Sequence, residues 1–127
     1  MLTLKNPSRL AAGSALIAGT LVLGAPAAHA DTCSGGSSGM NCGNYAPSAL
    51  LNHSCFEPSP TCGNRVLQVD TLSTTYSWFK CYVRGEKHSG DNNVWYYTNG
   101  DDSGNYGYIP ASRVFTNVDP APGLPHC

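Results

Sequence analysis

Six cysteines in a chain of 127 residues are the feature that most constrains the fold. All six follow residues 1–30, a segment that predicts a cleavable secretory signal peptide. Small exported chains pair their cysteines, so an even number predicts disulfides rather than reactive thiols. The cysteines are Cys33, Cys42, Cys55, Cys62, Cys81 and Cys127.

The predicted signal peptide has the three parts that export signals need. Lys5 and Arg9 form a basic start, residues 10–24 (LAAGSALIAGTLVLG) form an apolar segment, and the small residues of 28–30 form a cleavage site. The apolar segment is shorter than the ~20 residues that cross a bilayer. We therefore predict cleavage after Ala30, a secreted (extracellular) product and no membrane partner after cleavage.

The charge pattern argues against two classes of partner. The chain has a formal net charge of −1, and loss of Lys5 and Arg9 with the signal peptide changes this charge to −3. The sequence has neither the basic stripe of a nucleic-acid binder nor a polybasic membrane patch. We expect neither nucleic acid nor a membrane surface as a ligand.

The mature chain changes character near Cys62. Residues 31–63 hold four of the six cysteines and are rich in Gly, Ser, Asn and Pro, which predicts a loop-rich extension pinned by disulfides. Within it, residues 47–52 have a helix-like pattern that is too short to be stable alone. Residues 117–127 are Pro-rich and predict an extended tail pinned by Cys127.

The segment between these two parts predicts a small β domain over residues 64–116. Its β-prone runs are bounded by turn signals, of which the Asn-Gly pair that opens residues 99–104 is the strongest. Pro110 cannot donate to a strand ladder, so the last of these strands should end there. The expected strands cover residues 65–69, 76–84, 94–98 and 106–109.

The sequence alone leaves the disulfide connectivity open, because six cysteines allow fifteen pairings. We expect one bridge between Cys81 and Cys127, which would hold the tail along the sheet. The other four cysteines would then staple the extension, with Cys55–Cys62 closing a local loop.

One stretch resembles a known family. Residues 95–114 (WYYTNGDDSGNYGYIPASRV) resemble the second half of an SH3 domain, in which a Gly-aromatic-Ile-Pro segment leads into a short helical turn. Residues 81–86 (CYVRGE) resemble the start of bacterial SH3-like (SH3b) domains, which occur in exported cell-wall proteins. The resemblance covers about residues 64–116 and implies an all-β fold with a small five-stranded SH3-like barrel. The sequence departs from the family at Arg113, where an aromatic residue is expected.

The resemblance implies a ligand-binding groove on the barrel surface. Trp95 and Pro110 would lie together there with Tyr96 and Tyr108, since aromatic side chains give large contact areas at low entropic cost. These rings alternatively cover a thin core. The PGLP sequence of residues 122–125 adds a third reading, in which the tail occupies the groove.

Catalytic and metal-binding patterns are weak. The sequence has no nucleophile elbow and no paired glutamates, so we expect no enzyme, no metal and no cofactor. The acidic residues near the turn form no full calcium loop, and the histidines beside cysteines lack zinc-site spacing. These candidates are Asp91, Asn99, Asp101 and Asp102 for calcium, and His53 and His126 for zinc.

The predicted function is a secreted, non-catalytic SH3-like binding module. Its expected ligand is a cell-wall peptide, peptidoglycan or another extracellular protein. The alternative is a small disulfide-stabilised protease inhibitor that presents residues 54–63 or 87–93 as a rigid loop.

Overall fold

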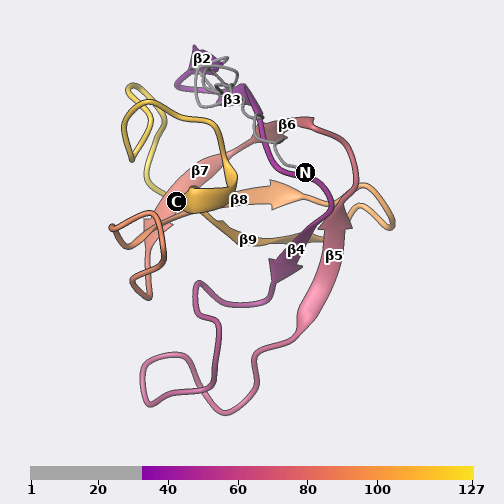
Figure 1. Cartoon of the computed structure of the whole chain (residues 1–127), viewed down its shortest axis with the longest axis vertical. Coiled ribbons are helices and arrows are strands. Elements are labelled where there is room, and N and C mark those ends of the chain that lie inside the picture. Colours follow the sequence, from indigo (N-terminus) through magenta and orange to yellow (C-terminus); the bar gives the residue numbers. More distant parts are fainter. Residues whose placement is uncertain (1–32) are drawn as a thin grey trace, which may run out of the picture. The chain divides into compact units, whose positions relative to one another are not determined.

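The computed structural model describes residues 33–127, so the predicted signal peptide lies outside the described residues. The described chain is all-β, as predicted, and forms two antiparallel sheets with the strand orders β2-β3-β6 and β5-β4-β9-β8-β7 (Figure 1). Neither sheet of this part of the chain is closed on itself. The elements are β2 (Ser34–Gly36), β3 (Gly39–Gly43), β4 (Ser48–Leu51), β5 (Gln68–Leu72), β6 (Tyr76–Phe79), β7 (Cys81–Arg84), β8 (Val94–Asn99), β9 (Tyr106–Pro110) and the 3-10 turn η3 (Ala111–Arg113).

The segment predicted as a loop-rich extension supplies three strands, which corrects that expectation. β2 and β3 build the smaller sheet, and β4 lies between β5 and β9 inside the larger one. Residues 47–52 are therefore extended and not helix-like. Leu50 is fully buried there, so long-range pairing and burial override a weak local preference. The boundary expected between residues 63 and 64 does not separate the sheets.

The strand predicted over residues 76–84 is divided at Lys80. Its first half, β6, pairs with β3 in the smaller sheet, and its second half, β7, pairs with β8 in the larger one. The backbone N–H of Lys80 donates to the Tyr97 carbonyl oxygen at 2.8 Å, so the chain stays tied to β8 at the division. The strand expected at 65–69 instead begins at Gln68, after a long loop that is prominent in Figure 1. β8 and β9 form the predicted hairpin.

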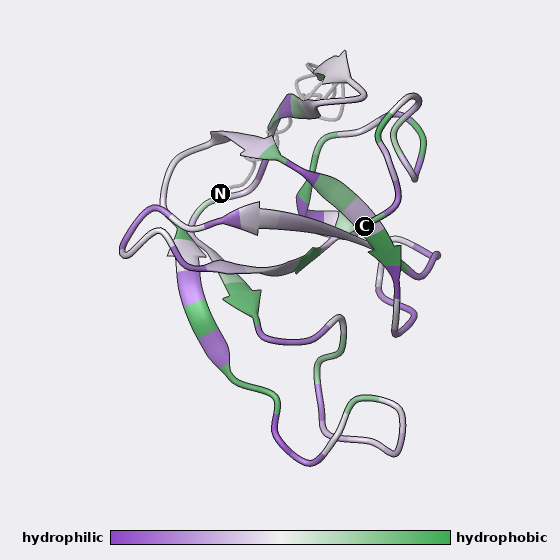
Figure 2. Ribbon diagram, turned by 180° about the vertical axis from the view of Figure 1, so that it is seen from behind, coloured by the Kyte–Doolittle hydropathy of each residue, from purple (hydrophilic) through white to green (hydrophobic). Residues whose placement is uncertain are grey.

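The core lies between the inner faces of the two sheets and the tail. Along β5, buried and more exposed residues alternate, but the hydropathy in Figure 2 does not follow burial, because the hydrophilic Asp70 is buried and the apolar Val69 is only half-buried. Burying a Val, Leu, Ile, Phe or Met side chain contributes ~1.5–3 kcal/mol, so this small cluster carries much of the stability. Its main members are Met40, Leu50, Leu72, Phe79, Val94, Tyr96, Ile109, Val114, Ala121 and Leu124.

Three disulfides close the described chain, in the pairs Cys33–Cys42, Cys55–Cys62 and Cys81–Cys127. The expected Cys55–Cys62 and Cys81–Cys127 bridges are confirmed. The tail does not run extended throughout, because the Leu124 N–H donates to the Ala121 carbonyl in a turn and both side chains are buried. After that turn, His126 pairs with Tyr82 at the edge of β7. The tail thus completes the core and extends the sheet edge.

Candidate binding surface

The residues expected to form an exposed groove are largely buried, which corrects the sequence-based site. Trp95 and Pro110 are cross-strand neighbours, as the pattern predicted, but Trp95 is 0% exposed and Pro110 is buried. Tyr96 is also 0% exposed and points to the opposite face of β8. Only Tyr108 of the four retains partial exposure.

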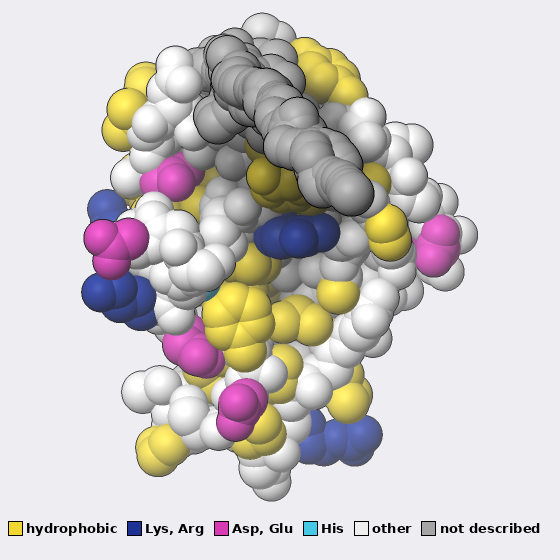
Figure 3. All heavy atoms as spheres, viewed as in Figure 1, with side chains coloured by type: hydrophobic (Ala, Val, Ile, Leu, Met, Phe, Trp, Pro, Cys, Tyr) yellow, Lys and Arg dark blue, Asp and Glu magenta, His cyan; other side chains and the backbone are white. Residues whose placement is uncertain are grey.

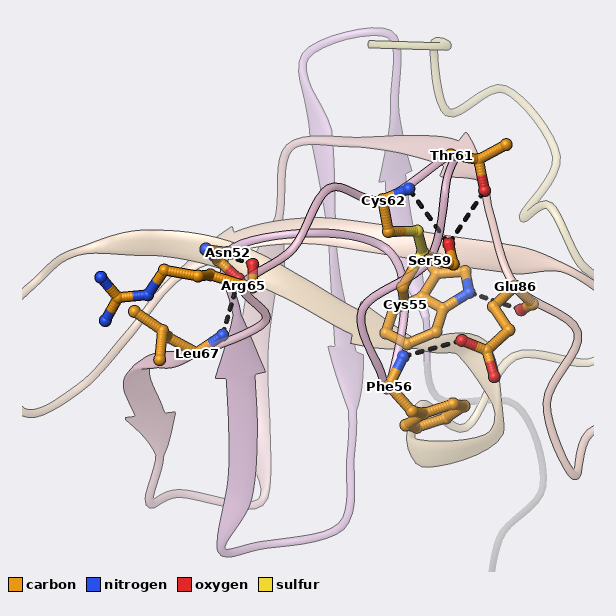
Figure 4. The surroundings of a disulfide bond; sticks show 10 residues. Asn52, Cys55, Phe56, Ser59, Thr61, Cys62, Arg65, Leu67 and Glu86 are labelled. Atoms are coloured by element: carbon orange, nitrogen blue, oxygen red, sulfur yellow. Dashed lines mark hydrogen bonds between the residues drawn. A yellow bond between two sulfur atoms is a disulfide. The ribbon is translucent and has the colours of Figure 1, made fainter.

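Trp95 is covered by the chain's own loop between β4 and β5. The ring of Phe56, which Figure 4 draws with its hydrogen bond to Glu86, packs on the Trp95 ring with 4.9 Å between centroids. The Trp95 indole Nε1–H donates to the Glu86 carbonyl oxygen at 2.8 Å. The Glu86 carboxylate in turn accepts the Phe56 N–H at 2.9 Å, and the Glu86 N–H donates to the Ser54 carbonyl at 2.9 Å. The predicted groove is therefore filled from within.

The Tyr96 ring is buried in the core, and its hydroxyl group binds the tail. Its hydroxyl donates to the Asp119 carboxylate at 2.7 Å and accepts the Ala121 N–H at 3.0 Å. Burial, and then the hydrogen bond to Asp119, raise the pKa of the Tyr96 phenol far above its usual range. The tail thus docks on the inner side of β8. The reading in which it occupies a groove beside Trp95 does not fit this arrangement.

An exposed cluster remains on the outer face of the β8–β9 hairpin. We call Tyr97, Tyr106, Tyr108 and Lys80 the tyrosine face. The Tyr97 ring stacks on Tyr106 at 5.1 Å and packs on Tyr108 at 4.8 Å between centroids. The Lys80 ammonium lies 5.7 Å from the centroid of the Tyr106 ring. On the face of the molecule that Figure 3 draws, hydrophobic side chains also reach the surface.

The packing of these rings decides which of their atoms face a ligand. Stacked rings cover each other's faces, so edges and hydroxyl groups are what they present outward. Ring edges carry partial positive charge, hydroxyl groups can donate, and Lys80 adds a full positive charge. Desolvation, followed by the neighbouring Tyr97, raises the pKa of Tyr108, which keeps its hydroxyl protonated. The tyrosine face therefore suits a ligand rich in hydrogen-bond acceptors or negative charge.

Tyr97, Tyr106 and Lys80 are not among the binding residues that the sequence predicts. The sequence does indicate Tyr97 and Tyr106, because residues two apart along a strand share a face. Tyr97 lies two residues after Trp95, and Tyr106 lies two residues before Tyr108. Lys80 gave no such signal, since its position depends on the division between β6 and β7.

Asp70 on β5 fastens the hairpin tip that carries Tyr106. Its carboxylate is almost fully buried and accepts backbone N–H groups. The Thr71 N–H, followed by those of the tip, lowers the pKa of Asp70 against the opposing effect of burial. The donors are Thr71 at 2.7 Å, Asn105 at 2.8 Å, and Asp102 and Ser103 at 3.1 Å.

Two of the acidic candidates have structural roles. The Asp101 carboxylate accepts the Ser73 and Thr74 N–H groups at 2.7 and 3.1 Å, and so closes the β5–β6 turn. Asp91 pairs with Lys87 at 3.3 Å. Within residues 33–127, no three His, Cys, Asp or Glu side chains converge as metal ligands would. The same residues include no helix long and apolar enough to cross a membrane.

A second exposed feature is the loop closed by Cys55–Cys62. Together with residues 84–86 it lines a groove of about 620 Å³. Internal bonds stiffen the loop, because the Ser59 N–H donates to the Gly63 carbonyl at 3.0 Å and the Cys62 N–H donates to Ser59 at 3.1 Å. This is the disulfide-closed segment that the inhibitor alternative requires.

Comparison with known proteins adds no neighbour, since no family model, curated protein or solved structure matches this chain.

Proposed function

We propose that this protein is a secreted, non-catalytic binding module whose five-stranded sheet and η3 turn are an open variant of the SH3-like barrel. Two features support the SH3-like assignment. The β8–β9 hairpin runs into η3 directly after Pro110, and β7 leads into a Gly-Glu pair at Gly85 and Glu86, as the family resemblance requires. The three disulfides suit an oxidising, extracellular compartment.

The ligand we propose is a cell-wall peptide, presented by peptidoglycan or by another extracellular protein. The observation that carries this proposal is the tyrosine face. Tyr106 is 43% exposed although it belongs to a small domain that needs apolar surface for its core. Exposed aromatic clusters of this kind mark interaction sites more often than isolated exposed rings do.

Sedimentation with purified peptidoglycan tests the proposal. We expect the mature protein to sediment, and Tyr106→Ala to weaken binding about tenfold, the loss typical of an interface tyrosine. Tyr76→Ala is the matched control, because Tyr76 is 52% exposed and lies outside the cluster. If Tyr76→Ala and Tyr106→Ala weakened binding equally, the tyrosine face would not be the site. If the wild-type protein bound neither peptidoglycan nor proteins of the wall, the proposed function would be wrong.

The loop closed by Cys55–Cys62 supports a second candidate, a protease inhibitor. Glu57, Pro58 and Thr61 are exposed on a loop that is already rigid, so a protease would lose little entropy in binding it. A panel of extracellular serine and metalloproteases tests this reading. Nanomolar inhibition that disappears in a Cys55→Ala/Cys62→Ala variant would support it, and the absence of inhibition across the panel would remove it.

A further inference from the structure

A pocket of about 280 Å³ lies beside the tyrosine face. Its walls come from three separate parts of the chain: the turn between β2 and β3, the end of β6, and the end of the tail. The Cys81–Cys127 disulfide forms part of the wall. The lining residues are Ser37, Ser38, Trp78, Lys80, Cys81, Pro125, His126 and Cys127.

The pocket and the tyrosine face form one continuous surface. Cys81 is the direct cross-strand neighbour of Tyr97, so both side chains point to the same face of the sheet. Lys80 belongs to both features, since it lines the pocket and its ammonium lies 5.7 Å from the Tyr106 ring centroid. A ligand on the tyrosine rings can therefore extend into the pocket past Lys80.

Hydrogen-bond donors predominate among the side chains that line the pocket, and Cys127, the last residue of the sequence, also brings its α-carboxylate to the wall. None of its lining side chains is a carboxylate. Lys80 forms no ion pair within residues 33–127, where Lys87 pairs with Asp91. The Trp78 indole nitrogen lies against the Gly39 backbone, and its N–H forms no hydrogen bond within residues 33–127, whereas the Trp95 indole N–H donates to Glu86. A positive charge with free neighbouring donors complements an anion.

We infer that this pocket binds a carboxylate of an acidic peptide whose neighbouring residues lie along the tyrosine face. The inference rests on the proposed function and specifies its ligand. Lys80 and the Trp78 indole N–H would hold the carboxylate, and Pro125 and the disulfide would contact the aliphatic part of the acidic side chain. Tyrosine hydroxyl groups would donate to the backbone carbonyls of an extended peptide.

An NMR titration tests the inference independently of the cell wall. The probes are acetyl-Glu-Ala-Glu-amide and the isosteric acetyl-Gln-Ala-Gln-amide, each added to the mature, oxidised protein. We expect the glutamate peptide to shift the Trp78 indole and Lys80 backbone signals, with little effect from the glutamine peptide. The Trp95 indole signal should stay in place, because that group is buried and already bonded to Glu86.

Two substitutions sharpen the titration. Lys80→Gln should weaken binding of the glutamate peptide about fivefold, as expected for loss of one partly solvated charge pair. Lys87→Gln removes an equally positive side chain that already pairs with Asp91, and should leave binding unchanged.

Equal shifts from both peptides, no shift at Trp78 and Lys80 with millimolar glutamate peptide, or equal losses in the two lysine variants would each overturn the inference. Stronger binding of inorganic phosphate than of the glutamate peptide at the same residues would also overturn it, in favour of a phosphate ligand. Failure of the wild-type protein to bind peptidoglycan or wall proteins would instead refute the proposed function. The two failures are distinguishable, because the peptide titration measures binding to the pocket whether or not the protein binds the wall.

Discussion

Removing the Cys81–Cys127 disulfide should destabilise the domain much more than removing Cys55–Cys62. The bridges close loops with sequence separations of 46 and 7 residues. A chain-entropy treatment of the unfolded state converts these lengths into about 4 kcal/mol for Cys81–Cys127 and about 2.4 kcal/mol for Cys55–Cys62. Because domains are stable by only ~5–15 kcal/mol, the first loss would remove a large part of the total.

The difference should be larger than loop length alone predicts. Cys127 holds the end of a tail that buries Ala121 and Leu124, and whose backbone pairs with Tyr82 through bonds of 3.1 and 2.9 Å. The Cys55–Cys62 loop is mostly exposed, and hydrogen bonds at Ser59 also hold it together. Fraying of the tail would therefore also expose the core residues Ala121 and Leu124.

Urea unfolding of two double variants, Cys81→Ala/Cys127→Ala and Cys55→Ala/Cys62→Ala, measures this difference. Double replacement avoids a free thiol that could exchange with the remaining bridges. Tryptophan emission reports the transition, and the slope with urea shows whether the native state of a variant has become less compact. An equal loss in the two variants, or a larger loss in Cys55→Ala/Cys62→Ala, would refute the reasoning from loop length and tail burial.

Three further perturbations probe the supports of the candidate site. Asp70→Asn should lower the free energy of unfolding at pH 7 and make it fall less steeply as the pH decreases, which urea unfolding from pH 7 to pH 2 measures. The pKa of Asp70 is lowered in the folded state, so the carboxylate contributes to stability above its unfolded pKa of ~3.9, and this contribution is lost as the pH falls through the lower folded pKa. Stability curves that run parallel for the variant and the wild type would contradict this. Gly100→Ala should destabilise the domain by ~1–3 kcal/mol, because the added Cβ would collide with the Asp70 carboxyl group. In Gly104→Ala the added Cβ meets no atom within 4 Å, and the loss of about 1–2 kcal/mol should come from its φ of 76° alone. Thermal melts in which Gly104→Ala is the more destabilised variant would exclude the steric account. Phe56→Ala should cost about 1 kcal/mol and speed hydrogen exchange of the Trp95 indole N–H, while unchanged exchange would mean that Phe56 does not shield it.

Local patterns in the sequence predicted the hairpin and the Cys55–Cys62 loop, and the expected long-range Cys81–Cys127 bridge is also confirmed. The turn-forming residues after Thr98 predicted where the strands stop, and β8 and β9 lie within a residue of their expected limits. The positive φ of this turn lies at Gly104, and not in the Asn-Gly pair. The helix-like pattern around Ser48–Leu51 misleads because so short an apolar segment fits a helix or a strand equally well. Its strand state comes from pairing with β5 and from burial of Leu50, and no local signal contains those contacts.

Three of the four predicted site residues lie on the same side of the sheet as the tyrosine face, and one of them, Tyr108, belongs to it. Alternation along β8 and β9 places Trp95, Tyr97, Tyr106 and Tyr108 on one side of the sheet. Which of them meets solvent depends on the loop that brings Phe56 over Trp95, a contact between residues far apart in the sequence. The sequence alone gives no reason to place that loop there.

Energetics explain why the largest ring is buried instead of binding a ligand. A buried aromatic side chain removes ~150–250 Å² from water, and at ~25 cal/mol per Å² Trp95 contributes roughly 4–6 kcal/mol. That amount is comparable with the whole stability of a domain of this size, so leaving the ring open would threaten the fold. Its indole N–H is satisfied by Glu86, which removes the usual penalty for burying a tryptophan. Exposing a tyrosine ring to water costs less free energy, because its hydroxyl group is well solvated. The aromatic side chains that the fold therefore leaves available to a partner are Tyr97, Tyr106 and Tyr108, beside Lys80.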